Sequence, residues 1–248
     1  MKKWIRWIAL SAVLISIWQI ASLITDNSLI CPSIFEIIAQ MIGQASSPVF
    51  YQALGMTLAR CVIGLFLSFI LALLAGAFSF WNQKIGWVCD QLCALLQSIP
   101  NVAFIILLLF WTGRNEAVVI VQILLLTPMI FRELHEGLKD IARTYHEVFV
   151  LYPQPLVEKL KKAALPMLEP MMRSSLKSAG SLGLKAVVMA EILASVSNGI
   201  GRQLQSARLN LNFAGVLGWV LWLMLISLLL EQGWNALFAW LEERSNSI

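Results

Sequence analysis

Long apolar runs separated by short polar segments dominate the pattern of this chain. The clearest is 61–80, CVIGLFLSFILALLAGAFSF, which holds no charged residue. Further runs lie at 1–24, 91–111, 117–131, 174–196 and 213–230. A helix needs about 20 mostly apolar residues to cross the hydrocarbon of a bilayer. The pattern therefore predicts an all-α membrane protein with about six transmembrane helices, in a single domain over 1–248.

The first and third runs each carry a distinguishing detail. The basic start of the chain is typical of a signal peptide, but its apolar run continues to Ile24 and no small-residue cleavage site follows. We therefore expect a retained first span. The third run contains Pro100, which lacks a backbone donor and predicts a kink or a change of packing there. Segment 25–56 is expected to be a loop that follows the first span.

The distribution of Lys and Arg predicts the orientation of the spans. The N-terminus begins with Lys2, Lys3 and Arg6, so we expect it in the cytoplasm. Segment 25–56 has no Lys or Arg and should face outward. Segment 132–173 is predicted to be cytoplasmic because it carries Arg132, Lys139, Arg143, Lys159, Lys161, Lys162 and Arg173. Both termini are then inside.

Composition narrows the class of protein further. Hydrophobic residues make up 59% of the chain and charged ones 13%, and the mean hydropathy is +0.77. The net charge of +4 is mild, and no Lys/Arg cluster interleaved with aromatics indicates nucleic acid. The four cysteines form no CxxC pair, so we expect free thiols and no metal site. His135 and His146 are expected to be exposed loop residues.

A charged, proline-rich segment at 145–166 interrupts the apolar pattern. Its first part, YHEVFVLY, should form about two helical turns that end at Pro153. A second amphipathic piece, LVEKLKKAAL, leads to Pro166. The apolar residues of the short helix suit docking into a groove of a partner protein. The alternative is an interfacial helix that lies on lipid.

The fifth apolar run contains charges that need partners. A lone cation near the middle of a bilayer costs about 3 kcal/mol or more, so Lys185 needs a carboxylate, a water-filled cavity or an anionic substrate. Glu191 lies six residues further on, at a different face, so a pair within the helix is unfavourable. Lys185 either lines the substrate path or pairs with a residue of another helix or subunit. Lys177 is near the cytoplasmic end and is expected to snorkel.

Three other polar residues accompany the apolar runs. Asn101, beside Pro100, either caps the helix break or meets substrate. Gln122 is either a hydrogen-bonding link between helices or a pore-facing residue, and the sequence does not separate these. Arg60 precedes the second run and is expected at the membrane interface.

The cytoplasmic segment resembles the signature of ATP-binding-cassette importer permeases. That signature reads E-A-A, three residues, Gly, nine residues, Ile, one residue, Leu-Pro. When its Leu-Pro is placed on Leu165 and Pro166, its Glu falls on Glu147 and its Gly on Pro153. Three of the seven fixed positions match. The proline keeps a helix break by different means.

The resemblance is closer to one branch, the nitrate/sulfonate/taurine-type permeases. These continue Leu-Pro-x-x-x-Pro, and Pro170 lies at that position. They later read V-V-A-E-M-L, which is similar to VVMAEIL at 187–193, with Glu191 in register. Their next block, G-L-G, is similar to GIG at 199–201. The motifs occur in the family's order along nearly the whole chain.

The resemblance implies a type I importer-like fold and a mechanism. The short helix between the fourth and fifth spans would be the coupling helix, which sits in a cleft of a separate ATPase. The residues implied in this coupling are Glu147, Val148, Phe149, Leu151, Tyr152, Pro153, Leu165 and Pro166. The chain lacks the phosphate-binding pattern G-x-x-x-x-G-K-[ST]. We therefore expect no enzyme and no cofactor bound by this chain, with ATP–Mg on the partner.

The resemblance also implies partners, a location and a substrate class. The partners would be two ATPase subunits, a second permease in a homodimer or heterodimer, an extracytoplasmic solute-binding protein and the lipid bilayer. The location would be a bacterial inner membrane. The solute would be small and anionic, such as a sulfonate, nitrate or taurine, with a thiamine-precursor pyrimidine or another small organic solute as the alternative. The expected translocation path contains Lys185, Glu191, Asn101 and Gln122.

Two other functions compete with the importer. An ATP-independent secondary transporter would favour an internal repeat and more buried acids, and no repeat is seen. A membrane-embedded enzyme would need His, Asp and Glu clustered at one interface, which the run RELHEGLKD at 132–140 could supply.

Overall fold

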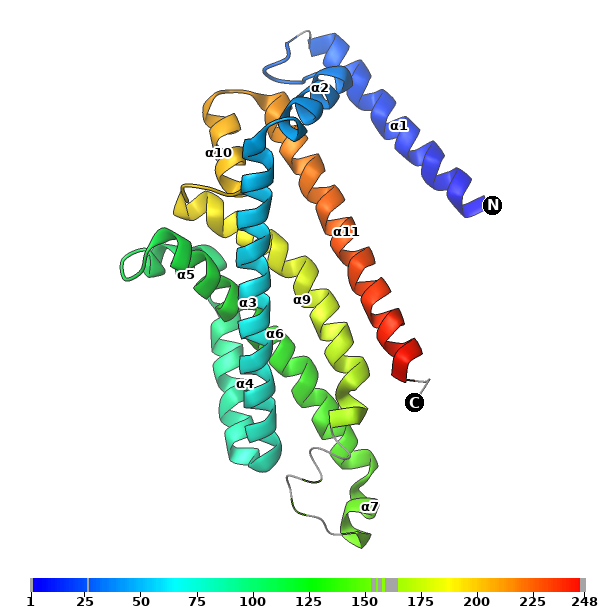
Figure 1. The fold of residues 1–248 in the computed structure, drawn as a ribbon, viewed down its shortest axis with the longest axis vertical. Coiled ribbons are helices and arrows are strands. Elements are labelled where there is room, and N and C mark those ends of the chain that lie inside the picture. The colour runs from blue at the N-terminus through cyan, green and yellow to red at the C-terminus, as the bar shows by residue number, and fades with distance from the viewer. Residues whose placement is uncertain (1, 26, 153–154, 156–157, 159–164, 246–248) are drawn as a thin grey trace.

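The computed structural model describes residues 2–25, 27–152, 155, 158 and 165–245 (Figure 1). Every regular element in these ranges is a helix, which confirms the predicted all-α class. The helices are α1 (Lys2–Thr25), α2 (Ile34–Ala45), α3 (Pro48–Trp81), α4 (Gln83–Ser98), α5 (Asn101–Leu108), α6 (Arg114–Thr144), α7 (His146–Leu151), α9 (Leu165–Ala194), α10 (Ile200–Leu209) and α11 (Phe213–Ser245).

The core is formed where α3, α6 and α9 pack against one another. On α6 the buried residues recur every three or four positions, the period of one helix face. They include Val118, Val121, Gln122, Leu126, Ile130, Leu134, Leu138 and Ile141. This face meets buried residues of α9 such as Leu184 and Val187. The three long helices therefore form the frame that positions the other elements.

Several helices are long and apolar enough to cross a bilayer. Among the described residues these are α3, α6 and α11, and the pair α4–α5 makes a fourth candidate although it bends by 90° at its break. Helix α9 has 30 residues and is about 45 Å long, but it carries Lys177, Lys185 and Glu191. The total of six spans stays a prediction, while the multi-span character is clear.

The structure corrects the predicted boundaries. Segment 25–56 is not a loop, because Ser33 caps α2 in a capping box with Glu36, and Ser47 caps α3 at Pro48. The predicted third span is two helices, because the chain is extended at Ile99 and turns before α5. The fourth span is also longer than predicted, since α6 runs 31 residues from Arg114.

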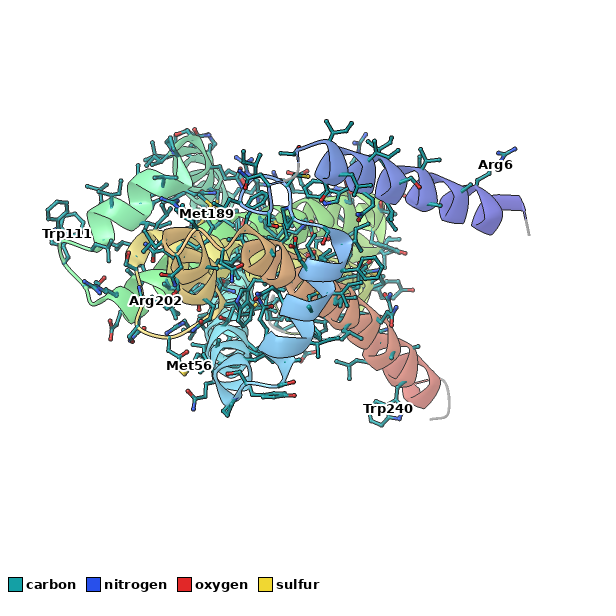
Figure 2. All side chains as sticks on the ribbon, turned by 90° about the horizontal axis from the view of Figure 1, so that it is seen from above. Arg6, Met56, Trp111, Met189, Arg202 and Trp240 are labelled. Atoms are coloured by element: carbon teal, nitrogen blue, oxygen red, sulfur yellow. The ribbon has the colours of Figure 1, made fainter. Side chains whose placement is uncertain are left out.

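The two ends of the molecule carry different elements. Helix α7 lies at one end of the bundle, and α2 and α10 lie at the other (Figure 1). The far ends of α1 and α11, marked by Arg6 and Trp240, stand away from the central helices (Figure 2). Helix α1 is attached near its C-terminal end, where Trp18 Nε1 donates to the Pro32 carbonyl at 3.0 Å. The predicted orientation would place α7 in the cytoplasm and α10 outside.

Candidate functional site

The short helix α7 presents apolar side chains to its surroundings. It spans six residues, His146–Leu151, as the sequence predicts. Leu151 is 74% exposed, Val150 63% and Val148 50%. Tyr152, which follows the helix, is 71% exposed. An apolar surface of this kind, at the tip of the bundle (Figure 1), is suited to burial against another protein.

The remaining residues of the predicted coupling set are only partly described. Glu147 is exposed in the first turn of α7, and Pro166 is exposed in the first turn of α9. Pro153 and most of 156–164 lie outside the described residues, as do the side chains of Phe149 and Leu165. Helix α9 begins at Leu165, so the coupling segment is followed along the chain by the helix that carries Lys177, Lys185 and Glu191.

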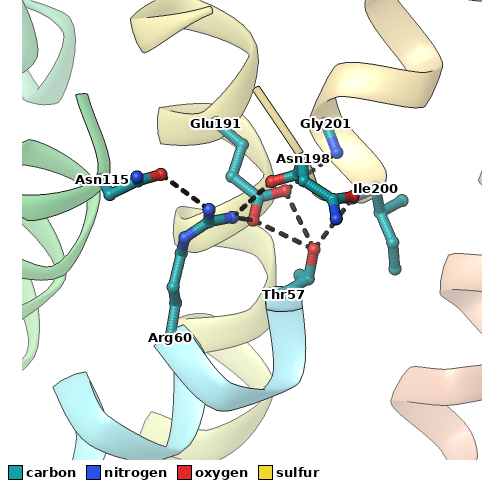
Figure 3. Close-up of polar contacts among 7 residues, drawn as sticks. All are labelled: Thr57, Arg60, Asn115, Glu191, Asn198, Ile200 and Gly201. Atoms are coloured by element: carbon teal, nitrogen blue, oxygen red, sulfur yellow. Dashed lines mark hydrogen bonds and ion pairs between the residues drawn. The ribbon is translucent and has the colours of Figure 1, made fainter. Parts of the chain in front are cut away.

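A buried ion pair joins α3 to α9 near the opposite end. Arg60 Nη1 contacts the Glu191 carboxylate, and both side chains are buried (Figure 3). Thr57 Oγ1 donates to the same carboxylate at 3.0 Å. Arg60 is therefore held between helices, while its expected position at the membrane interface stays a prediction. Because α3 begins at Pro48, Arg60 is about 18 Å inside the helix.

The same carboxylate caps the start of α10. The Gly201 amide donates to Glu191 Oε2 at 2.9 Å, and the Ile200 amide donates to Thr57 Oγ1 at 2.9 Å. The first amides of a helix have no partner within the helix, and its positive N-terminal end favours a carboxylate. Here the partners come from α3 and α9, so the ion pair also fixes α10.

Two glycines allow this close approach. Gly199 has φ +144°, a conformation that side-chain-bearing residues rarely adopt. A Cβ on Gly201 would lie 2.7 Å from the Val188 carbonyl oxygen and 2.9 Å from the Ile192 amide nitrogen. Both are backbone atoms of α9 that cannot rotate away. The GIG block at 199–201 is therefore a packing requirement for seating α10 on α9.

Arg60 extends these contacts to two more segments. It donates to the Asn198 carbonyl at 2.8 Å and to Asn115 Oδ1 at 2.8 Å. We call the whole set the Glu191 cluster (Figure 3): Thr57, Arg60, Asn115, Glu191, Asn198, Ile200 and Gly201. It connects α3, α6, α9 and α10 through groups that are largely out of contact with solvent.

Lys185 is not part of the Glu191 cluster. It is exposed on α9, and within the described part of the chain its ammonium has no hydrogen bond or ion pair. It lines two grooves, of about 610 and 440 Å³, which share only Lys185 and Met189. Neither of the predicted alternatives is settled, but a carboxylate from the described residues of this chain is not its partner.

Asn101 and Gln122 occupy different environments. Asn101 is exposed and lines the 440 Å³ groove with Lys185. Pro100 is the capping residue of α5 and no side chain caps that helix, so the expected capping by Asn101 is not found. Gln122 is buried, and its Nε2 donates to the Cys61 carbonyl at 2.9 Å. It is thus a link between α6 and α3.

His135 belongs to a second polar contact, near the end of the bundle that carries α7. It is buried on α6 rather than exposed in a loop as expected. Its Nδ1 lies 2.7 Å from Ser79 Oγ on α3, and its Nε2 lies 3.3 Å from Asp90 Oδ2 on α4. No local pattern in the sequence indicates these contacts, because the two partners lie on other helices. His146 is exposed as expected, but it is the first residue of α7 rather than a loop residue.

The His135 contacts connect three helices instead of collecting acids at one interface. No group of three or more His, Cys, Asp or Glu that could hold a metal is found where the structure is described. A Cβ on Gly86 would lie 2.5 Å from Ser79 Oγ and 3.1 Å from His135 Cε1. A groove of about 350 Å³ nevertheless lies beside the imidazole, and its lining includes Asp90, His135 and Lys139.

Comparison with known proteins places the whole arrangement in context. Residues 64–245 match the family described as "Binding-protein-dependent transport system inner membrane component". The chain is 27% identical over 190 residues to a formylaminopyrimidine transport permease of Halalkalibacterium halodurans, covering 76% of this chain and 75% of the relative.

Two further relatives have sulfur-containing solutes in their names. The chain is 24% identical over 223 residues to a putative aliphatic sulfonates transport permease of Bacillus subtilis, covering 86% of this chain and 79% of the relative. It is 23% identical over 234 residues to the taurine transport system permease of Escherichia coli, covering 91% and 84%.

Proposed function

The chain belongs to the family of binding-protein-dependent transport system inner membrane components, as a permease subunit of an ABC transporter, and from that premise we propose how it works. It forms the path of an importer for a small anionic solute, and its α7 segment seats on a separate ATPase. The observation that carries this proposal is the exposed apolar surface of α7 at one end of the bundle.

The surroundings of α7 support docking on a protein. Three exposed apolar side chains lie on the six-residue helix and Tyr152 directly follows it, and α6 leads into the helix. An isolated helix of this length is not stable in water, so a partner surface is needed to hold it. Movement of α7 would be transmitted to α9, which begins a short distance further along the chain.

The test is a charged substitution on α7 with a matched control. Leu151→Asp should prevent co-purification of the ATPase and abolish ATP-driven uptake, because a carboxylate would be buried in an apolar contact. Leu209→Asp places the same change on α10, at the opposite end, where Leu209 is 66% exposed. That control should keep the ATPase, while both variants insert into the membrane as well as the parent.

Two outcomes would count against coupling at α7. One is normal ATP-driven uptake by the Leu151→Asp protein. The other is equal loss of the ATPase from both variants, since that would point to general misfolding rather than to a contact of α7.

The proposed solute path follows the exposed face of α9. Lys185 and Asn101 face the grooves, whereas Glu191 and Gln122 are buried in contacts between helices. We therefore assign the first two to the path and the other two to holding the path's walls. A conformational change requires different contacts in its two states, and α9 connects the coupling end to the Glu191 cluster.

The solute is proposed to be anionic because of Lys185. An unpartnered cation in an apolar-walled groove attracts negative charge. The alternative, a neutral pyrimidine, is favoured by the similarity to the formylaminopyrimidine permease. Uptake by membranes that contain the whole transporter, measured with ethanesulfonate, bicarbonate, taurine and formylaminopyrimidine, separates these possibilities. Uptake of the pyrimidine alone would contradict the anion assignment and leave the importer function intact.

The remaining parts of the importer belong to the same proposal. Two ATPase subunits would bind ATP–Mg, and this chain would bind no cofactor. A second permease, identical or diverged, would complete the path, and a solute-binding protein would dock outside near α10. The chain would lie in a bacterial inner membrane with both termini in the cytoplasm, as the basic residues predict.

A further inference from the structure

We propose that Lys185, Asn101 and Gln97 form an anion subsite that accepts a small oxyanion and disfavours a solute bearing an ammonium group. This inference rests on the proposed function, because it names the chemistry of the solute on the same path. It differs from the general path assignment in identifying the groove, its polar groups and the kind of solute that it rejects.

The groove lies where the bent pair α4–α5 faces α9. Gln97 is near the end of α4, Asn101 is the first residue of α5, and Lys185 approaches from α9. The groove has a volume of about 440 Å³. Its walls are completed by apolar side chains such as Phe104 and Met129. Two side-chain amides and one ammonium supply N–H donors, and oxyanions are acceptors.

No described acidic residue lines the grooves beside Lys185, so a partner for its ammonium has to come from outside the described chain. None of the residues lining either of its two grooves is Asp or Glu. By contrast, Lys177, on the same helix, lies 3.7 Å from Glu231 of α11. Because a cation this deep in a membrane protein faces the interior or a water-filled cavity, Lys185 is available for an anion that enters the groove.

A symmetric pair of permeases would strengthen the same preference. In a two-fold dimer a patch at the axis meets its own copy. The exposed stripe of α9 that contains Leu182, Lys185, Met189 and Leu193 would then meet a second Lys185 and no carboxylate. An added ammonium on the solute would meet the Lys185 charge and no carboxylate among the groove-lining residues, so a plain anion is preferred to a zwitterion of the same size.

The test uses a thiol beside Lys185 as a probe of local charge. Met189 lines both grooves, so Met189→Cys is made in a protein whose partly exposed Cys31 and Cys89 are serine. The full-length chain with its co-purified subunits is held in lipid nanodiscs. Its labelling rates are measured with anionic sulfonatoethyl and cationic trimethylammonioethyl methanethiosulfonate. Lys185→Met is the test variant and Lys177→Met the matched control.

The expected result is a preference for the anionic reagent that depends on Lys185. Lys185→Met should lower the anionic-to-cationic rate ratio by about fivefold or more, because one nearby charge acts oppositely on the two reagents. Lys177→Met should leave the ratio unchanged. Millimolar ethanesulfonate should slow the anionic labelling when Lys185 is present, and taurine, which differs by one ammonium group, should slow it less.

Four results would overturn the subsite. The first is a thiol that neither reagent reaches, which would mean a groove sealed by protein or lipid. The second is a rate ratio that does not change in Lys185→Met. The third is no protection by ethanesulfonate, which is expected if a lipid phosphate already occupies Lys185. The fourth is protection by taurine equal to that by ethanesulfonate. Labelling requires no ATP, so these results are independent of whether the chain proves to be coupled to an ATPase.

Discussion

Replacing Arg60 by Met isolates the energetic role of the Glu191 cluster. The substitution keeps an apolar stem similar to the methylene chain of arginine but removes the guanidinium, which leaves the Glu191 carboxylate buried without its cation. Breaking a buried pair by removing one partner costs about 3–5 kcal/mol. Glu191 retains the Thr57 hydroxyl and the Gly201 amide as donors, so we expect a loss near 3 kcal/mol.

A second substitution distinguishes lost charge pairing from lost packing. In Arg60→Met with Glu191→Gln no buried charge remains, and the new amide oxygen still accepts from Thr57 and Gly201. We expect the double variant to be within about 2 kcal/mol of the parent, the remainder reflecting the Asn115 and Asn198 groups that lose a donor.

The assay is reversible unfolding in mixed detergent and dodecyl sulfate micelles, followed by circular dichroism. Arg114→Met is the control, because Arg114 is an exposed residue near the same end whose bond to the Ser195 carbonyl is at the surface. It should change the unfolding free energy by about 0.5 kcal/mol or less. A loss below about 1 kcal/mol for Arg60→Met, or a double variant less stable than the single one, would refute the reasoning.

Two further predictions concern the elements at the end opposite α7. Gly201→Ala should lower the unfolding free energy by about 1–3 kcal/mol through overpacking against the backbone of α9. Gly55→Ala is the control, because a Cβ there has nothing within 4 Å, and it should change the unfolding free energy by about 1 kcal/mol at most. Equal effects of the two substitutions would contradict the packing argument. Hydrogen bonds from the Ser28 hydroxyl and, to a smaller extent, from the Ser33 backbone amide lower the pKa of Glu36 below its ordinary value of 4.5. The Glu36 carboxylate therefore stabilises the start of α2 fully above that ordinary value, and this stabilisation is lost as pH falls through the lowered pKa. Amide exchange protection of α2 should therefore decrease in acid, and in Glu36→Gln it should become independent of pH in that range.

The sequence predicted the elements that depend on local pattern. The run at 61–80 lies inside α3, and the short helix at 145–152 appears as α7, because apolar composition and flanking prolines act over a few residues. The boundaries were less accurate where polar caps extend a helix, as at Ser33 and Ser47. The break at Pro100 was expected, but its 90° angle depends on packing against α6 and α9.

The contacts between distant residues were the least accessible from sequence. The pattern of the fifth run predicts that Lys185 needs a partner or a cavity, but nothing in the sequence connects Glu191 with Arg60. The two residues are 131 positions apart, and no local period connects them. Gly199 and Gly201 stand out in the sequence as part of a motif, but their role depends on how α10 packs against the backbone of α9.

The central claim is that α7 is the surface by which an ATPase drives this permease. Site-specific photo-cross-linking tests it most directly, with a benzophenone amino acid at Leu151, in cells that express the complete transporter. Mass spectrometry should identify the cross-linked partner as a protein containing the G-x-x-x-x-G-K-[ST] loop, while the same probe at Leu209 should not capture it. Cross-linking of Leu151 to lipid alone would contradict the account.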